Sequence, residues 1–187
     1  MQVKAKAISG GKQRFASFYS IYNRLMETSP ETLRVLAKDF VFPTLDLTTY
    51  NPEPIIFHHD GKVIIQMVYK PFEEDPSLIS NVQKEAMASV EQVAKDIGIE
   101  LDSQVGDIQF VNNYAILHSR DKFEDSAENN RHLLRLGIRD PENAWNVPHK
   151  YEKLFNQSFN VPLEKQNIPV TDFDPWRATA TQTWDHG

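Results

Sequence analysis

Two stretches near the end of the chain decide the fold: residues 106–120 read GDIQFVNNYAILHSR, and residues 131–139 read RHLLRLGIR. Both are rich in apolar residues interrupted by charged or polar ones at short, regular intervals. This pattern is typical of strands, in which successive side chains point to opposite faces of the sheet. We expect two strands here, joined through an acidic loop over 119–130 and lying side by side as antiparallel neighbours.

The two strands carry the residues with candidate chemistry. Strand alternation puts Arg131 and Arg135 on one face, at the end of the pair where His118 lies. Two inward-facing guanidiniums are costly to bury without an anion, and each can bind a carboxylate through two hydrogen bonds. An imidazole beside them suits a metal together with a dicarboxylate. The pattern leaves open that each arginine pairs with an acid of its own chain and that His118 is a hydrogen-bonded core residue.

Further towards the N-terminus, the pattern predicts a mixture of strands and helices. We expect a strand over 3–8 that ends at Gly10-Gly11, and an extended stretch over 42–54. Asp60-Gly61 between apolar runs predicts a hairpin over 55–65. Antiparallel strands with helices packed on one side are the expected architecture.

Three helices are predicted in the same region. The first follows from apolar residues at helical spacing, namely Phe15, Phe18, Tyr19, Tyr22, Leu25 and Met26. The second begins at Ser29-Pro30-Glu31, which places proline and an acid in the first turn. The third runs from about Ser80, with Gln83 completing a capping box, to Ile97, and Gly98 ends it.

Length and composition limit the function. The length of 187 residues indicates one domain. The net charge of -6 argues against a nucleic-acid partner. No apolar run approaches the roughly 20 residues of a membrane span, and no signal peptide is visible. Cysteine is absent from the sequence, which excludes disulfides, thiolate metal sites and a cysteine nucleophile. We therefore expect a cytoplasmic protein without a membrane or nucleic-acid partner.

The residues quoted above, with Phe123 and Arg139-Asp140-Pro141, resemble the C-terminal half of the TauD/TfdA-like (taurine dioxygenase) family. The segments 7–11, 22–23 and 60–62 also resemble it, so the likeness covers nearly everything from Val3 to about Pro148. These proteins are iron(II)- and 2-oxoglutarate-dependent oxygenases. The resemblance implies an α+β fold, a partial double-stranded β-helix (jelly-roll) with flanking helices. We expect that domain over 1–171 and a polar tail or flap over 172–187.

The resemblance also implies roles for individual residues. His118 would be the distal iron ligand, Arg131 would bind the far carboxylate of 2-oxoglutarate, and Arg135 would lie near an anionic or polar part of the substrate. Iron(II) sites of this kind use two histidines and one carboxylate and leave positions open for the oxoacid and dioxygen. The implied cofactors are therefore Fe(II) and the cosubstrate 2-oxoglutarate.

The other two iron ligands of the family come from a His-x-Asp or His-x-Glu motif upstream of the segment that matches Val3 to Ala7. Only Met1 and Gln2 precede that segment here, so we expect the chain to lack the part that carries the motif. His58 and Asp60 form an internal His-x-Asp, 60 residues before His118 (118 − 58). They are the substitute ligands, although Asp60 also belongs to the predicted turn.

Two functions follow from the resemblance. One is a dioxygenase, an oxidoreductase that acts on a small organic substrate while 2-oxoglutarate is converted to succinate. The other is a catalytically incomplete family member that binds an anion or a partner through Arg131 and Arg135 without turnover. A barrel that lacks strands would expose strand edges, so we also expect two copies to pair as a homodimer through such edges.

Overall fold

The computed structural model describes residues 1–43, 50–126, 130–140, 142–160, 162 and 164. The chain divides into two compact units, Met1–Arg135 and Leu136–Gly187. Among the described residues, no helix has the length and apolar character needed to cross a membrane. The predicted domain boundary at residue 171 and the tail over 172–187 lie outside the described residues.

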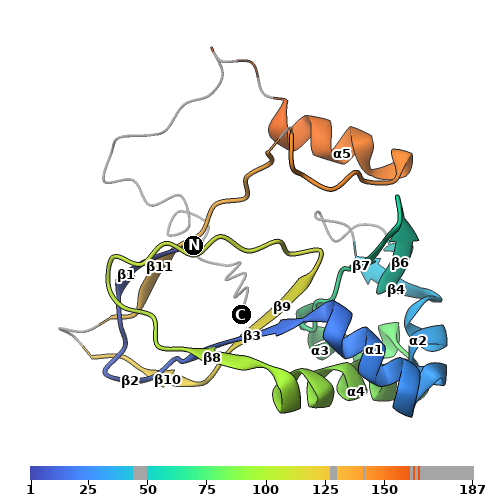
Figure 1. Cartoon of the computed structure of the whole chain (residues 1–187), viewed down its shortest axis with the longest axis horizontal. Helices are drawn as coiled ribbons and strands as arrows, with labels where there is room; N and C mark the ends of the chain where they lie inside the picture. The colour runs from blue at the N-terminus through green and yellow to red at the C-terminus, as the bar shows by residue number, and fades with distance from the viewer. Residues whose placement is uncertain (44–49, 127–129, 141, 161, 163, 165–187) are drawn as a thin grey trace. The chain divides into compact units, whose positions relative to one another are not determined.

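The first unit mixes short strands with helices (Figure 1). Its strands are β1 (Gln2–Ala5), β2 (Ser9–Gly10), β3 (Gln13–Ser17), β4 (Asp39–Pro43), β5 (Tyr50–Pro54), β6 (Ile56–His59), β7 (Lys62–Ile65), β8 (Ile99–Leu101), β9 (Ile116–Arg120), β10 (Phe123–Glu124) and β11 (His132–Leu134). Its helices are α1 (Phe18–Thr28), α2 (Pro30–Leu36), α3 (Lys70–Glu74), the 3-10 helix η1 (Pro76–Leu78) and α4 (Asn81–Ile97). The predicted α+β class is confirmed.

The strands pair as separate small sheets. Strand β3 is central in a three-stranded antiparallel sheet of order β8-β3-β9, and the other pairs are β1 with β11, β2 with β10, β4 with β5, and β6 with β7. Within the described residues these sheets form no closed barrel.

The core of the first unit lies between the helices and the neighbouring strands. Helix α1 buries one stripe of side chains, and α4 packs against both α1 and α2. The largest fully buried side chains are Phe18, Phe40, Ile21, Leu25, Leu36, Ile55, Ile64, Ile65, Met87 and Val90. This apolar core holds β3 and β4 beside the helices and so supports the strand that pairs with β9.

Several local predictions are confirmed. The hairpin of β6 and β7 turns at Asp60 and Gly61, both at positive φ (49° and 71°), as a two-residue hairpin of this kind requires. Helix α4 has the predicted capping box: the Ser80 hydroxyl accepts from the Gln83 backbone N–H, and the Gln83 side chain accepts from the Ser80 N–H. Helix α2 begins at Pro30 as predicted.

Other local predictions need correction. Phe15 belongs to β3 and not to the first helix, because Ser17 caps that helix by accepting a hydrogen bond from the Ser20 N–H. Tyr19 and Met26 are exposed as a result, and Ile21 lies on the buried stripe. The extended stretch predicted over 42–54 is not a loop in its described part, which belongs to the β4–β5 pair, where edge prolines are tolerated. Residues 108–111 form only an isolated bridge, between Ile108 and Gln2.

The second unit contains helix α5 (His149–Phe159). Its N-cap is Pro148. Glu152 lies in the first turn, where its negative charge interacts favourably with the positive end of the helix dipole.

Candidate functional site

The candidate site lies along a bent ribbon in the first unit. Strands β1, β2 and β3 pair in turn with β11, β10 and β9, so residues 2–17 run antiparallel to residues 116–134. Figure 1 shows this ribbon turning at β2 and β10. The turn separates the part that carries His118 from the part that follows Arg131.

This arrangement overturns one prediction. The strands that carry His118 and Arg131 are not neighbours, because β9 pairs with β3 and β11 pairs with β1. The segment between them is not a simple loop: Phe123 and Glu124 form β10, which pairs with Gly10 and Ser9. Local sequence patterns reveal strand type but not which strand is the partner, so the pairing was assigned to the nearest strand in the sequence.

His118 lies on one face of the β8-β3-β9 sheet, directly opposite Phe15. The two rings meet edge to face with centroids 6.1 Å apart, and the imidazole is half-buried. Burial lowers the pKa of His118, and the positive charge of Arg135 lowers it further. The site therefore favours a neutral imidazole, which is the form that binds a metal.

Arg131 lies at the turn of the ribbon, against Phe123. Its guanidinium carbon is 5.4 Å from the centre of the Phe123 ring, and that of Arg120 is 4.4 Å from the same centre. The backbone N–H of Arg131 donates to the Asp125 carboxylate at 2.8 Å. Two guanidiniums thus share one aromatic ring, an arrangement in which the ring quadrupole favours both cations.

Arg135 follows β11 and is exposed, and its positive charge contributes to the lowered pKa of His118. Arg120 is a further candidate that the sequence reasoning did not select. Strand alternation provides the signal, because Arg120 follows His118 by two residues on β9 and shares its face. We call the four candidate residues His118, Arg120, Arg131 and Arg135 the cluster; within it, Arg120 and Arg131 meet over the Phe123 ring.

A polar network continues this face beyond Arg120. Gln13, which lies opposite Arg120 and is buried, accepts hydrogen bonds from Ser103 (3.0 Å) and from Gln109 (2.8 Å). Gln109 also donates to the Ser103 hydroxyl at 2.7 Å. These bonds hold the segment around 103–109 against β3, and the side-chain amide oxygen of Gln109 is buried without a hydrogen-bond partner among the described residues.

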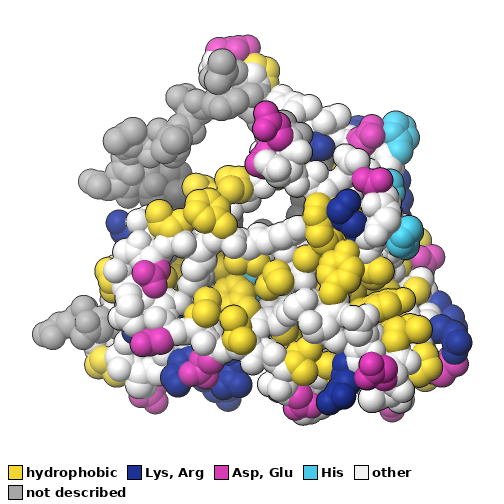
Figure 2. Space-filling model, viewed as in Figure 1, with side chains coloured by type: hydrophobic (Ala, Val, Ile, Leu, Met, Phe, Trp, Pro, Cys, Tyr) yellow, Lys and Arg dark blue, Asp and Glu magenta, His cyan; other side chains and the backbone are white. Residues whose placement is uncertain are grey.

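On the opposite face of the sheet, Arg14 pairs with acidic residues of its own chain. Arg14 forms ion pairs with Glu100 at 3.3 Å and with Asp121 at 3.4 Å. Lys12 pairs with Glu100 as well. Figure 2 shows side chains of both charges gathered along the margin where β8, β2 and β10 lie. These pairs are largely exposed to solvent, so each contributes little to stability.

The alternative metal ligands do not join this cluster. His58 is exposed on β6, and Asp60 lies in the turn of the β6–β7 hairpin. Across the part of the chain that the structure describes, no three histidine, aspartate or glutamate side chains gather so that they could hold a metal ion. One imidazole does not make the three-ligand iron site that the family resemblance implies.

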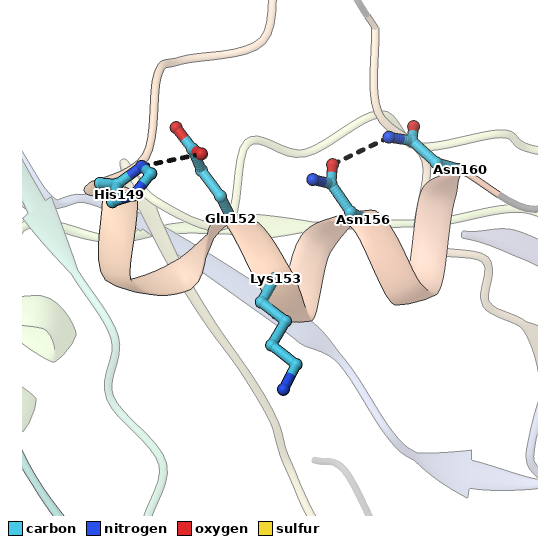
Figure 3. Close-up of a pocket in the computed structure, with 5 residues that line it drawn as sticks. All are labelled: His149, Glu152, Lys153, Asn156 and Asn160. Atoms are coloured by element: carbon cyan, nitrogen blue, oxygen red, sulfur yellow. Dashed lines mark hydrogen bonds and ion pairs between the residues drawn. The ribbon is translucent and has the colours of Figure 1, made fainter.

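A separate hollow lies along helix α5 in the second unit (Figure 3). His149 and Glu152 form an ion pair there at 2.9 Å, and Asn160 donates to the Asn156 side chain at 2.8 Å. The lining side chains, with Lys153, come from this helix and are exposed. The hollow is an open polar helix face, and none of the predicted site residues lines it.

Comparison with a family model gives a match over the whole of the first unit. The model described as "Taurine catabolism dioxygenase TauD, TfdA family" matches residues 1–136. This range ends one residue after the first compact unit, so the matched residues include His118 and all three arginines of the cluster.

Two curated proteins are similar to this chain. One is the taurine hydroxylase-like protein SAT17 of Stachybotrys chartarum, 32% identical over 175 residues that cover 85% of this chain and 44% of that protein. The other is FR-33289 synthase of Streptomyces rubellomurinus, 26% identical over 160 residues that cover 76% of this chain and 47% of that protein. The chain therefore spans less than half the length of each relative.

Solved structures of asparagine oxygenase share the fold. One holds Fe(II), 2S,3S-3-hydroxyasparagine and succinate, and superposes with a TM-score of 0.52 at 14% identity over 70% of this chain and 41% of that chain. A second gives a TM-score of 0.51 at 14% identity over 70% of this chain and 39% of that chain. At this identity the likeness concerns the fold alone.

Proposed function

Because this chain belongs to the taurine catabolism dioxygenase TauD/TfdA family, we propose that it takes part in the iron(II)- and 2-oxoglutarate-dependent oxidation of a small organic substrate. Its part in that reaction is to bind the oxoacid. The chain spans less than half of its curated relatives, so the proposal concerns the portion that this chain provides.

One observation carries the proposal: the guanidiniums of Arg120 and Arg131 gather over the Phe123 ring, on the ribbon that also carries His118. The positive charge of Arg135 contributes to the lowered pKa of His118. A dicarboxylate fits such a cluster, because each guanidinium can hold a carboxylate through paired hydrogen bonds. In the proposal Arg131 binds the far carboxylate of 2-oxoglutarate, and Arg135 meets an anionic or polar part of the substrate.

The proposal extends to His118 and to the architecture. The half-buried, neutral imidazole of His118 serves as one metal ligand. The ribbon of β1–β3 and β9–β11 is one turn of a partial jelly-roll, which the likeness to asparagine oxygenase supports at the level of the fold. The described residues hold no group of three metal ligands, so the part proposed for this chain is to bind the oxoacid and to supply one iron ligand.

The second candidate function, binding without turnover, has an observation in its favour. His58 and Asp60 do not gather with His118 into a group of metal ligands within the described residues. We therefore expect the chain alone to bind 2-oxoglutarate without converting it to succinate. Incubation with Fe(II), 2-oxoglutarate and air, followed by succinate assay, checks this; succinate that disappears in His118→Ala would identify a complete enzyme.

The oxoacid role is tested by substituting the two arginines that share Phe123. We expect Arg131→Ala to weaken 2-oxoglutarate binding about tenfold or more, because it removes charge-assisted hydrogen bonds. Arg120→Ala is the matched control, since it removes the same charge from the same Phe123 ring and is expected to have the smaller effect. Isothermal titration or NMR titration measures both, and equal losses would contradict the role of Arg131.

A further inference from the structure

We propose that Gly11 is a positioning residue for Arg131: the missing side chain at position 11 leaves the space through which the arginine stem passes. The effect on 2-oxoglutarate binding rests on the function proposed above. The packing of Gly11 against Arg131 does not depend on that function.

Gly11 is held in place by the turn of the ribbon. Its backbone N–H donates to the Lys122 carbonyl at 3.0 Å, directly beside the pairing of Gly10 with Phe123. Its φ is +70°, in the left-handed region that favours glycine. The backbone at this point is therefore fixed, and any side chain added there would have a fixed direction.

That direction leads into the candidate site. A Cβ atom built on Gly11 would lie 3.3 Å from both Cδ and Nε of Arg131, and 3.2 Å from Cβ of Phe123. Cβ of Phe123 is attached directly to the paired strand β10 and cannot move away without the backbone. The arginine stem is the neighbour that can yield, so a methyl group at position 11 would displace Arg131 by a few tenths of an ångström.

Such a displacement matters for a guanidinium that binds a carboxylate. A pair of hydrogen bonds to one carboxylate requires both guanidinium nitrogen atoms in the correct place. A misplacement of about 1 Å at a reaction site can cost up to about 100-fold in rate. For the smaller shift expected here, we predict that Gly11→Ala weakens 2-oxoglutarate binding about tenfold.

The chain offers a matched control for the strain of a positive φ. Gly61, in the β6–β7 turn, has a φ of +71°, and a Cβ atom built there meets nothing within 4 Å. Gly11→Ala and Gly61→Ala therefore introduce the same methyl group at nearly the same positive φ. They differ in the contact with Arg131 and Phe123.

The experiment compares wild type, Gly11→Ala and Gly61→Ala by ¹⁵N NMR of the arginine Nε–H groups, with the Arg131 signal assigned by its loss in Arg131→Ala. We expect Gly11→Ala to move the Arg131 Nε–H signal and to weaken the titration with 2-oxoglutarate, and Gly61→Ala to do neither. An unmoved Arg131 signal in Gly11→Ala would overturn the inference. A moved signal in a protein whose wild type does not bind 2-oxoglutarate would support the packing and overturn the proposed function instead.

A double-variant cycle keeps the inference testable if Gly11→Ala folds poorly. In an Arg131→Ala background the stem is absent and only the contact with Phe123 remains, so Gly11→Ala should cost less stability there than it does in wild type. A loss in melting temperature that is unchanged by Arg131→Ala would show that the methyl group acts through Phe123 or the backbone, and the inference would fail.

Discussion

The surroundings of His118 change the pKa of its imidazole. The imidazole packs edge to face on Phe15, and burial together with the charge of Arg135 lowers its pKa below the ordinary value of 6.5. His132, on β11, is in contrast exposed. The two histidines lie in different sheets and differ in burial.

This lowered pKa predicts how stability depends on pH. Between the lowered folded pKa and about 6.5 the unfolded chain binds more protons at this residue than the folded chain, so the free energy of unfolding rises with pH. The contribution is fully present above about pH 6.5 and is lost as the pH falls towards the folded pKa. We expect His118→Gln to reduce the loss of stability on acidification from about pH 7.5 to 5. Urea denaturation across this range measures it.

The control for this prediction is His132→Gln, which changes an exposed imidazole on β11. It should keep the pH dependence of the wild type. Identical pH dependence in wild type and His118→Gln would show that the folded environment does not oppose protonation of this imidazole.

At the scale of the element, helix α4 links the core to the strands around the site. The helix packs against α1 and α2, and the side chain of Gln83 donates to the Asp39 carbonyl of β4 at 3.0 Å. Its first turn is closed by the reciprocal bonds of Ser80 and Gln83. The capping box therefore satisfies backbone groups of the helix and also orients the residue that ties the helix to β4.

Loss of this cap should lower the free energy of unfolding. We expect Ser80→Ala to lower the free energy of unfolding by about 1 kcal/mol, because an N–H in the first turn loses its acceptor. Ser89→Ala is the matched control in the same helix, since the Ser89 hydroxyl donates only to the Glu85 carbonyl of the preceding turn. Chemical denaturation of both variants checks this, and similar losses would contradict the role of the cap.

At the scale of the whole molecule, some strands of the ribbon are hydrogen-bonded to a neighbouring strand on one side only. Within the described residues, β9 and β11 lie at the edges of their sheets. Leu134 on β11 is 45% exposed, and Phe110, which precedes β9 in the chain, is 81% exposed. Open strand edges and exposed apolar side chains favour association with another chain.

We therefore expect the homodimer proposed from the sequence to involve these edges. Light scattering after size-exclusion chromatography should give a dimer for the wild type and a smaller species for Leu134→Lys, because lysine on an edge strand disfavours strand pairing. Val82→Lys, at a 59% exposed position on α4, should leave the mass unchanged. A monomeric wild type at all concentrations would exclude this association.

Local features of the fold were predictable because neighbouring residues decide them. Asp60-Gly61 favours a tight turn whatever surrounds it, and Ser80 with Gln83 can close a helix turn from within four residues. The first helix shows the limit of such reasoning: Phe15 matches the helical spacing, yet it pairs with His118 in a sheet. Tertiary pairing overrode the local periodicity there.

The sequence by itself determined the family, the mixture of helices and strands, and the identity of His118, Arg131 and Arg135 as candidate site residues. Only the tertiary structure decided that β9 and β11 pair with β3 and β1, that Arg120 shares the Phe123 ring with Arg131, and that Gly11 borders the arginine stem. The physical reason is that side-chain periodicity reports the face of a strand, whereas the partner of a strand depends on contacts between residues about a hundred positions apart in the sequence.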